Sequence, residues 1–422
     1  MKSSTICQEW LDSLPLTEGY LKNEQSIGRE FLLEKGMPSK KDEAWRLSNF
    51  NKLNSFLSLP TIIDSEDIKS ILPEKDANRE RIIIHPNKNP ILNLNLPIGI
   101  EELNNKEIEE NLGKIVKSTN IKNDISVCLN QASSLEILAL KVKRNQNHSL
   151  EIVIPSIEEK SISTRIFFLI EEGAKLDLLQ IFLGKNNSAQ NHLIEIKLEA
   201  QAEFTHGFIS LGEEKESSSI CTLAVDQSEK SKYSLHSIHH GWDYARFEPR
   251  IIQSEGEAST IIKGLQVTKS KEQIATHSLI RFEGPNGKLD QLQKAVASEY
   301  SHCIFNGSIE VPQKAQKTEA AQLSRNLLLS KRARIDTKPE LEIVADDVRC
   351  THGATVSQLQ DEELFYLLSR GIDKQCANSL LLQGYYDDVI SHFPKSAGKW
   401  NFIEKLIPVS YTHLTLPTNR EV

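Results

Sequence analysis

Apolar and polar residues alternate along the middle of the chain. In the segment NHLIEIKLEA, Ile194, Ile196 and Leu198 alternate with Glu195 and Lys197. Successive side chains of a β-strand point to opposite faces, so this period of two predicts a strand with one apolar face. The segment SLEIVIP at 149–155 repeats the pattern. Further strand-like runs centre near Ile137, Phe167, Leu179, Phe208, Ile262, Ile309 and Ile343.

These runs predict a long all-β core. Early in the core they follow one another at roughly thirteen to fifteen residues, separated by glycines and polar clusters. Over some two hundred residues, no helix-length apolar pattern interrupts them, which argues against alternating strands and helices around a parallel sheet. A solenoid, a large sandwich and a barrel all remain possible, because we find no sharp sequence repeat that would choose among them.

Helical patterns flank the core on both sides. Residues 1 to about 60 are typical of helices, and the segment SKKDEAWRLSNFNKL from Ser39 is expected to be helical, with Trp45 covering an apolar seam. Residues 60 to about 125 carry only short apolar runs and receive no firm assignment. The helical period returns near residue 360, where Asp361, Glu362 and Glu363 suit a helix N-terminus. A second helix is expected from about Asp373.

The pattern divides the chain into four parts. We predict an N-terminal helical or mixed domain at 1–125, a β core at 126–358 and a C-terminal helical domain at 359–408. The last fourteen residues, VSYTHLTLPTNREV at 409–422, have no amphipathic period and resemble translated adapter sequence. We therefore treat them as a non-native tail and assign them no function.

Composition narrows the class of protein. The 422 residues are 39% hydrophobic and 26% charged, as in soluble globular proteins, and no apolar run is long enough for a membrane span. The formal charge of −8 argues against a nonspecific nucleic-acid binder. The six cysteines are scattered without a CxxC motif, and the N-terminus has no signal-peptide pattern. We expect free thiols in a reducing compartment.

The strongest local feature is LEIVADDVRCTHGAT at 341–355. Cys350 and His352 are two residues apart, so on a strand they share a face, with Cα atoms roughly 6.5 Å apart. Thiolate and imidazole are both ligands for soft and borderline metals. Two side chains do not complete a tetrahedral site, so further ligands would have to come from elsewhere, for example from a partner chain. A buried free cysteine beside a hydrogen-bonded histidine is the structural alternative.

Other candidate motifs favour structural roles. Asp346 and Asp347 are adjacent and would face opposite ways on a strand, which suits turn residues better than paired acid–base catalysis. HSIHH at 236–240 lacks a nearby carboxylate or cysteine to complete a metal site. GPNGKL at 284–289 lacks the spacing of a phosphate loop and predicts a turn. The basic run at 322–336 alternates like a strand and is expected to be a solvated face.

The stretch from Gly307 to Ile372 closely resembles the core signature of the SufB/SufD family of iron–sulfur cluster assembly proteins. The motifs occur in order: AQ-x-T, Q-x-x-RNLLLS, TKPELEI, DDV-x-C-x-HGAT, LFYL and SRGI. The resemblance implies a mainly β protein, with a right-handed parallel β-helix core flanked by N-terminal and C-terminal α-helical domains. Within the family, the length and the helical N-terminal region look more like SufD than SufB.

The resemblance also implies a function. A SufD-like chain would be a non-catalytic scaffold that pairs with a SufB-like subunit through its β-helix end, and it would dock the ATPase SufC through helices at about 361–393. His352 and Cys350 would then face a transient iron–sulfur cluster at the heterodimer interface. The chain itself would bind no nucleotide, nucleic acid or membrane, and it would work in the cytoplasm or, in a eukaryote, in the plastid stroma.

Two rival functions are weighed against this one. In the first, the chain only braces SufB and recruits SufC, without ligating a cluster. In the second, it is a β-helix enzyme acting on carbohydrates. The absence of a signal-peptide pattern and the poor placement of Asp346 and Asp347 count against the carbohydrate enzyme.

Overall fold

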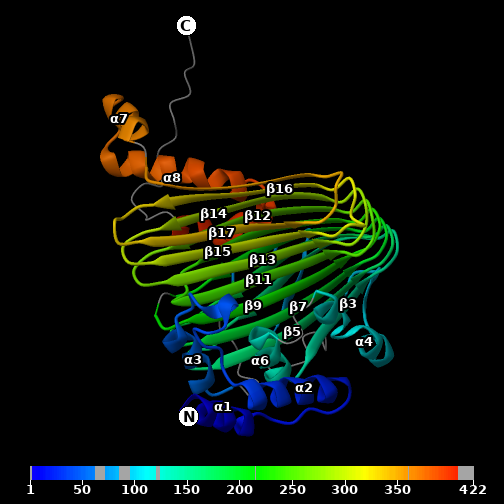
Figure 1. Ribbon diagram of the computed structural model, residues 1–422. Coiled ribbons are helices and arrows are strands. Elements are labelled where there is room, and N and C mark those ends of the chain that lie inside the picture. Colours follow the sequence, from blue (N-terminus) through cyan, green and yellow to red (C-terminus); the bar gives the residue numbers. More distant parts are fainter. Residues whose placement is uncertain are drawn as a thin grey trace.

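The computed structural model describes residues 2–61, 72–84, 96–119, 124–213, 215–359 and 361–406. Its body consists of two facing nine-stranded sheets (Figure 1). The first sheet contains, in spatial order, β1 (Glu80–Ile83), β4 (Asn147–Pro155), β6 (Lys175–Leu183), β8 (Glu203–Leu211), β10 (Lys232–His240), β12 (Ser259–Thr268), β14 (Lys288–Ala297), β16 (Glu319–Leu328) and β18 (Arg349–Ser357). The second contains β17 (Arg334–Ile343), β15 (His302–Val311), β13 (Gln273–Phe282), β11 (Tyr244–Gln253), β9 (Ser218–Gln227), β7 (Ala189–Leu198), β5 (Ser161–Ile170), β3 (Ile137–Val142) and β2 (Ile100–Glu102).

From β3 onward, consecutive strands alternate between the two sheets, so that two strands make one coil of a solenoid. Residues that contact one another on adjacent coils are 28 apart in the chain at Thr164 and His192, and 31 apart at Gln291 and Gln322. Strand pairing is parallel throughout both sheets except between β2 and β3. The mainly β, parallel β-helix prediction is therefore confirmed, and the sandwich and barrel alternatives are excluded.

The corners of the coils explain why no sequence repeat was visible. One corner repeats a left-handed backbone conformation, for example at Asn145, Gln201, Asn286 and Lys317 with φ of 59°, 60°, 59° and 58°. At this corner the backbone N–H donates to a carbonyl of the next coil, as Asn286 does to Gln316. Glycine would adopt this conformation most easily, yet most of these positions are not glycine. The stack therefore repeats in geometry without repeating in residue type.

The apolar face of each strand forms the interior between the sheets. Ile194, Ile196 and Leu198, predicted to share a face, are all buried in this interior. Each such side chain contributes about 1.5–3 kcal/mol on burial. Glu195, on the opposite face of β7, is also buried, because helices cover that side of the sheet and the backbone of Gly113 donates to its carboxylate.

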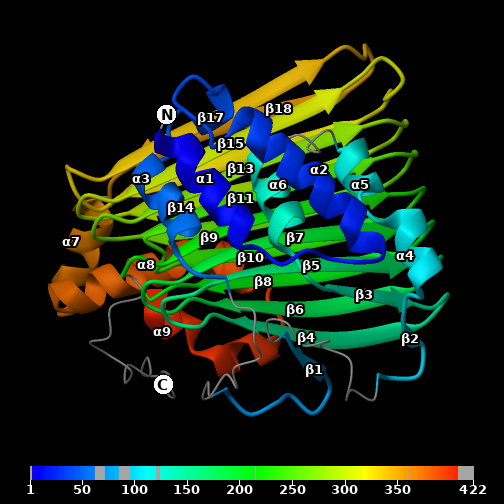
Figure 2. The same cartoon turned by 90° about the horizontal axis from the view of Figure 1, so that it is seen from below.

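N-terminal helices cover the outer face of the second sheet (Figure 2). They are α1 (Lys2–Ser13), α2 (Tyr20–Lys35), the 3-10 helix η1 (Glu43–Trp45), α3 (Phe50–Ser58), α4 (Asn105–Asn111), α5 (Lys114–Ser118) and α6 (Ile125–Ser133). The segment 60–125, which received no assignment from sequence, thus contributes α4 and α5 to this layer, and β1 and β2 to the sheets.

The continuous helix expected from Ser39 is wrong. Only the 3-10 turn at Glu43–Trp45 forms there, and α3 begins at Phe50 with Asn49 as its N-cap. A tertiary contact overrides the local preference. The guanidinium of Arg246 lies over the buried Trp45 ring at 3.9 Å and donates to the Ala44 carbonyl. An α-helix would instead use that carbonyl to accept from the residue four positions on.

C-terminal helices follow the solenoid. Residues of α8 (Lys374–Ile390), the 3-10 helix η2 (Lys395–Trp400) and α9 (Phe402–Leu406) pack on the outer face of the first sheet, whereas α7 (Asp361–Ser369) contacts α8. The two helices predicted near Asp361 and Asp373 are confirmed, and the Asp373 side chain caps α8 by accepting from the N–H of Gln375. The predicted non-native tail at 409–422 lies outside the described residues. None of the described helices is long and apolar enough to span a bilayer.

Candidate functional site

The solenoid has an open end at β17 and β18, the last strand of each sheet (Figure 2). Among the described residues, β18 pairs only with β16, and β17 pairs only with β15. One side of each strand therefore keeps unpaired backbone N–H and C=O groups. An exposed strand edge of this kind can accept a strand from another chain. The open end thus offers the free backbone groups that such pairing requires.

Cys350 and His352 both lie on β18 at this open end. Cys350 is in register with Ala320 of β16, and His352 is in register with Gln322. The side chains of Ala320 and Gln322 are buried in the solenoid interior. Since neighbouring parallel strands in register point the same way, Cys350 and His352 continue the interior-facing side out to the open end. The structure therefore brings the two predicted ligands onto one face.

The thiol and the imidazole have different environments. Cys350 is half-buried and packs against the interior cluster, whereas His352 is exposed. Burial raises the pKa of the Cys350 thiol above its ordinary value, and a backbone hydrogen bond at Ala320 partly offsets that rise. The resting group is thus the thiol. A metal bound there would have to displace its proton.

The pair can supply at most two ligands. Within the part of the chain that the structure describes, no group of three or more His, Cys, Asp or Glu side chains is placed to hold a metal ion. A tetrahedral site would need two further ligands in addition to Cys350 and His352. The arrangement can therefore hold a metal or cluster only together with groups from outside these residues.

Asp346 and Asp347 are corner residues, as their adjacency predicted. The Asp346 carboxylate accepts from the side-chain amide of Gln313 at 2.9 Å. The backbone N–H of Asp347 donates to Gln316, and its carbonyl accepts from the N–H of Lys317. Both residues are exposed, and the last corner is held by the side chain of Asp346 and the backbone of Asp347. Nothing in this geometry resembles a catalytic carboxylate pair.

The histidines of the HSIHH segment lie on opposite faces of β10. His236 points outward and stacks on His392 of the C-terminal region, with ring centroids 5.2 Å apart. His239 points inward against Phe208 and Phe247. Burial lowers the pKa of His239 to about 3, so the ring is neutral at physiological pH. The structural interpretation of these histidines is the one that the packing supports.

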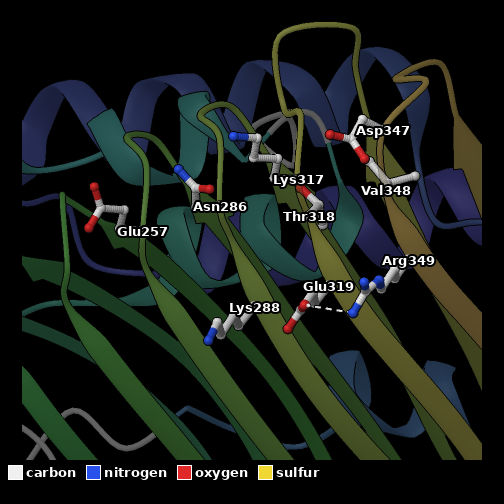
Figure 3. A pocket seen from close by; sticks show the side chains of 9 residues that line it. All are labelled: Glu257, Asn286, Lys288, Lys317, Thr318, Glu319, Asp347, Val348 and Arg349. Carbon is white, nitrogen blue, oxygen red and sulfur yellow. Dashed lines mark ion pairs between the residues drawn. The ribbon is translucent and has the colours of Figure 1, made fainter.

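A pocket of about 690 Å³ lies at the corner that leads into β18 (Figure 3). Its charged lining alternates in sign, and Arg349 pairs with Glu319 at 3.7 Å. Asn286 of the GPNGKL segment lines it from the turn that the sequence predicted. With both signs present in equal number, the pocket favours no charged ligand. The charged residues are Glu257, Lys288, Lys317, Glu319, Asp347 and Arg349.

Sequence reasoning missed a row of polar side chains inside the solenoid. Gln291 and Gln322 occupy interior positions on β14 and β16 and are both almost fully buried. The amide Nε2 of Gln322 donates to Oε1 of Gln291 at 2.8 Å. The sequence did contain a signal: both glutamines lie at positions of the alternating strand pattern where apolar residues are expected. His352 occupies the next level of the same row.

Comparison with known proteins places these features in a family. The family model "SUF system FeS cluster assembly, SufBD core domain" matches residues 153–385. An iron–sulfur cluster assembly SufBD family protein of Synechocystis is 28% identical over 403 residues, which cover 89% of this chain and 88% of the relative. The iron–sulfur cluster assembly protein SufD of Escherichia coli is 27% identical, over 91% of this chain and 92% of its own. The chloroplastic protein ABCI7 of Arabidopsis thaliana is 32% identical, over 54% of this chain and 49% of its own.

Proposed function

Since the chain belongs to the SufBD family of iron–sulfur cluster assembly proteins, we propose that it acts as a SufD-like scaffold subunit and not as an enzyme. Its open end pairs with a SufB-like subunit, and its C-terminal helices dock a SufC-like ATPase. The similarity to SufD of Escherichia coli along nearly the whole of both chains supports the SufD-like role. It acts in the cytoplasm or the plastid stroma, a proposal that the bacterial and chloroplastic relatives support.

One observation carries the proposal: His352 and Cys350 share the interior-facing side of an edge strand that is paired on one side only among the described residues. The rim around them carries apolar side chains among charged ones, and Ile343, Val344 and Val356 are all more than one-third exposed. Apolar side chains beside free backbone groups suit a partner that adds its own strand and covers the rim. That partner would bring its ligands to the face where His352 and Cys350 lie.

The chemistry of the pair suits a nascent cluster, which is cargo and does not stay with the chain. An imidazole is a neutral ligand for iron, and a thiolate binds iron within a cluster. The exposed His352 can bind without rearrangement. The Cys350 thiol must first lose its proton, and burial makes that loss harder. We therefore assign His352 the principal role and Cys350 a supporting one.

The C-terminal helices offer a second surface. On α7, the side chains of Phe365 and Tyr366 are 71% and 56% exposed. Aromatic side chains so exposed on a short helix are typical anchors for a partner protein. We propose that this surface binds the SufC-like ATPase, which would carry the nucleotide chemistry. In that case ATP-driven motion would reach the open end through α8 and the first sheet.

Replacement of His352 by Ala tests the proposal in cells that also produce the SufB-like and SufC-like partners. The complex should still assemble, because His352 is exposed and supports no packing, but clusters should not accumulate. The matched control is Thr351→Ala, a neighbouring exposed residue on the opposite face of β18. Cys350→Ser should reduce cluster content less than His352→Ala. Normal cluster content in the His352→Ala complex would refute a ligand role for His352.

The architectural alternative gives a different result in the same experiment. If the chain only braces SufB and recruits SufC, the double variant lacking both Cys350 and His352 should keep full cluster content. Truncation of α7 should then be the more damaging change, because recruitment of the ATPase would be the chain's main contribution.

A further inference from the structure

The interior row beneath His352 ends in an unused hydrogen-bond acceptor. Gln291 donates through Nε2 to the hydroxyl of Ser278 at 2.9 Å, and Gln322 donates through Nε2 to Oε1 of Gln291 at 2.8 Å. Gln322 is 2% exposed, and its own Oε1 has no hydrogen-bond partner among the residues that the structure describes. A buried amide oxygen without a partner is costly, on the order of 1–3 kcal/mol. A hydrogen-bond donor placed near the Gln322 Oε1 would remove this cost.

The orientation of the Gln322 amide is fixed by its surroundings. Its Nε2 is committed to Gln291 on the coil below, which turns Oε1 away from that coil. From the opposite sheet, Gly307 lies directly against the amide. A Cβ at that glycine would stand 2.5 Å from the Gln322 Nε2. The row therefore has a direction, with donors pointing into the solenoid and one acceptor left at the top.

His352 is the residue on the next coil at that level. It is in register with Gln322 on the neighbouring parallel strand, where Cα atoms lie about 4.8 Å apart. A neutral imidazole carries one N–H donor, and the hydrogen bond of that N–H decides which ring nitrogen remains free to bind a metal. Metal-binding histidines generally donate their other N–H to an acceptor of this kind.

We infer that Gln322 is a positioning residue for His352: its Oε1 accepts the imidazole N–H, which holds the ring in one tautomer and aims the other nitrogen at the mating subunit. The role of the contact in cluster binding rests on the proposed function, whereas the hydrogen bond between Gln322 and His352 does not. It assigns a role to an interior glutamine that touches neither cluster nor partner.

The test begins with the full-length chain labelled with ¹⁵N at its histidines. The His352 resonances are identified by their loss in His352→Gln, and the tautomer ratio is read from the ¹⁵N shifts. Gln322→Leu should bring the ratio close to that of a free imidazole. The wild-type ratio should differ from the Gln322→Leu ratio by roughly three- to tenfold, as a single hydrogen bond implies. The control, Gln293→Leu, removes a buried glutamine two residues along β14 from the row and should leave the ratio unchanged.

A second variant keeps the test decisive if Gln322→Leu fails to fold. Gln322→Met keeps the length of the side chain but has no amide oxygen, so it should shift the tautomer ratio as Gln322→Leu does. A His352 tautomer ratio that equals the wild-type ratio in either folded variant would overturn the inference.

The final step separates this inference from the proposed function. In the assembled complex, Gln322→Leu should bind cluster iron with about 10- to 100-fold lower affinity. This is the usual effect of losing the hydrogen-bond partner of a metal ligand. If the tautomer shifts but iron retention does not, the contact forms without positioning His352 for the cluster, and the inference fails. If His352→Ala itself leaves cluster content normal while the Gln322 contact is observed, it is the proposed function that fails.

Discussion

The attachment of α8 to the solenoid gives a prediction whose magnitude follows from the structure. Lys294 of β14 is almost fully buried beneath α8. Its ammonium donates to the Asp388 carboxylate and to the Tyr385 carbonyl, each at 2.6 Å, and it lies 4.1 Å from the centre of the Tyr385 ring. All three contacts are to α8. Removing the carboxylate by Asp388→Ala leaves a buried charge with only part of its partners.

The expected cost of Asp388→Ala is about 2 kcal/mol. Breaking a fully buried ion pair costs about 3–5 kcal/mol, whereas a single hydrogen bond to a charged group is worth about 1.5–3 kcal/mol. Asp388 is half exposed, so water can replace part of its contact with Lys294, and the lower range applies. Lys294→Met should cost less than Asp388→Ala, because it removes the buried charge itself and leaves an apolar side chain in its place.

Hydrogen exchange of the α8 amides is the appropriate assay, because the loss should open α8 locally before the solenoid unfolds. A cost of about 2 kcal/mol corresponds to roughly 30-fold faster exchange along α8. Asp387→Ala, an exposed neighbour on the same helix, is the control and should have little effect. The hydrogen bond from Lys294 lowers the pKa of Asp388, so its contribution is present above about pH 4 and is lost as the pH falls further. Exchange rates unchanged by Asp388→Ala, or a larger effect of Lys294→Met, would mean that the Lys294–Asp388 ion pair does not hold α8 on the solenoid.

Three further predictions concern the interior, the docking surface and acid stability. Gly307→Ala should lower the free energy of unfolding by about 1–3 kcal/mol in urea titrations, because its methyl group would meet the Gln322 amide and the Phe305 ring; Gly384→Ala, with no atom within 4 Å, should not destabilise the protein. Phe365→Ser should weaken binding of the SufC-like ATPase at least tenfold by calorimetry and leave the unfolding temperature unchanged. Stability should fall as the pH drops from about 6.5 towards 3, by up to about 1.4 kcal/mol per pH unit for each neutral interior histidine, because the unfolded chain takes up protons that the folded chain excludes. Burial lowers the pKa to about 3 at His192, His206 and His239.

Each of these has an outcome that contradicts it. Equal stability of the Gly307→Ala and wild-type proteins would mean that the interior is less tightly packed than the contacts indicate. Unchanged ATPase binding by Phe365→Ser would move the docking surface away from α7. A flat stability profile between pH 6.5 and 4 would show that the interior histidines are protonated or hydrated in the folded state.

The strand faces could be predicted from the sequence, and the solenoid could not. A period of two suffices to send Ile194 and Ile196 to one side, because that choice is local. The coil geometry depends on left-handed corner residues such as Lys317 and Gln201, which no residue type marks. The resemblance of the motifs to a known family supplied the missing topology. The failed helix at Ser39 has a similar origin, since Arg246 reaches Ala44 across 202 residues of chain.

Part of the candidate site could likewise be predicted from the sequence, and part could not. That Cys350 and His352 share a face follows from their spacing alone. The degree to which they are exposed does not follow from the spacing, because it depends on whether another coil covers β18. One coil below, the residues of β16 in the same register are buried. The role inferred for Gln322 was also out of reach from sequence, since it depends on contacts with Gln291, 31 residues away, and with Gly307 on the opposite sheet.

The central claim is that an imidazole of this chain binds the nascent cluster at the open end. Electron spin-echo spectroscopy of the reduced, cluster-loaded complex tests it directly, with ¹⁵N-histidine introduced into this chain alone and mixed with unlabelled partners. We predict a ¹⁵N hyperfine coupling that disappears in His352→Gln. A fully loaded cluster that shows no ¹⁵N coupling in the wild-type complex would contradict it.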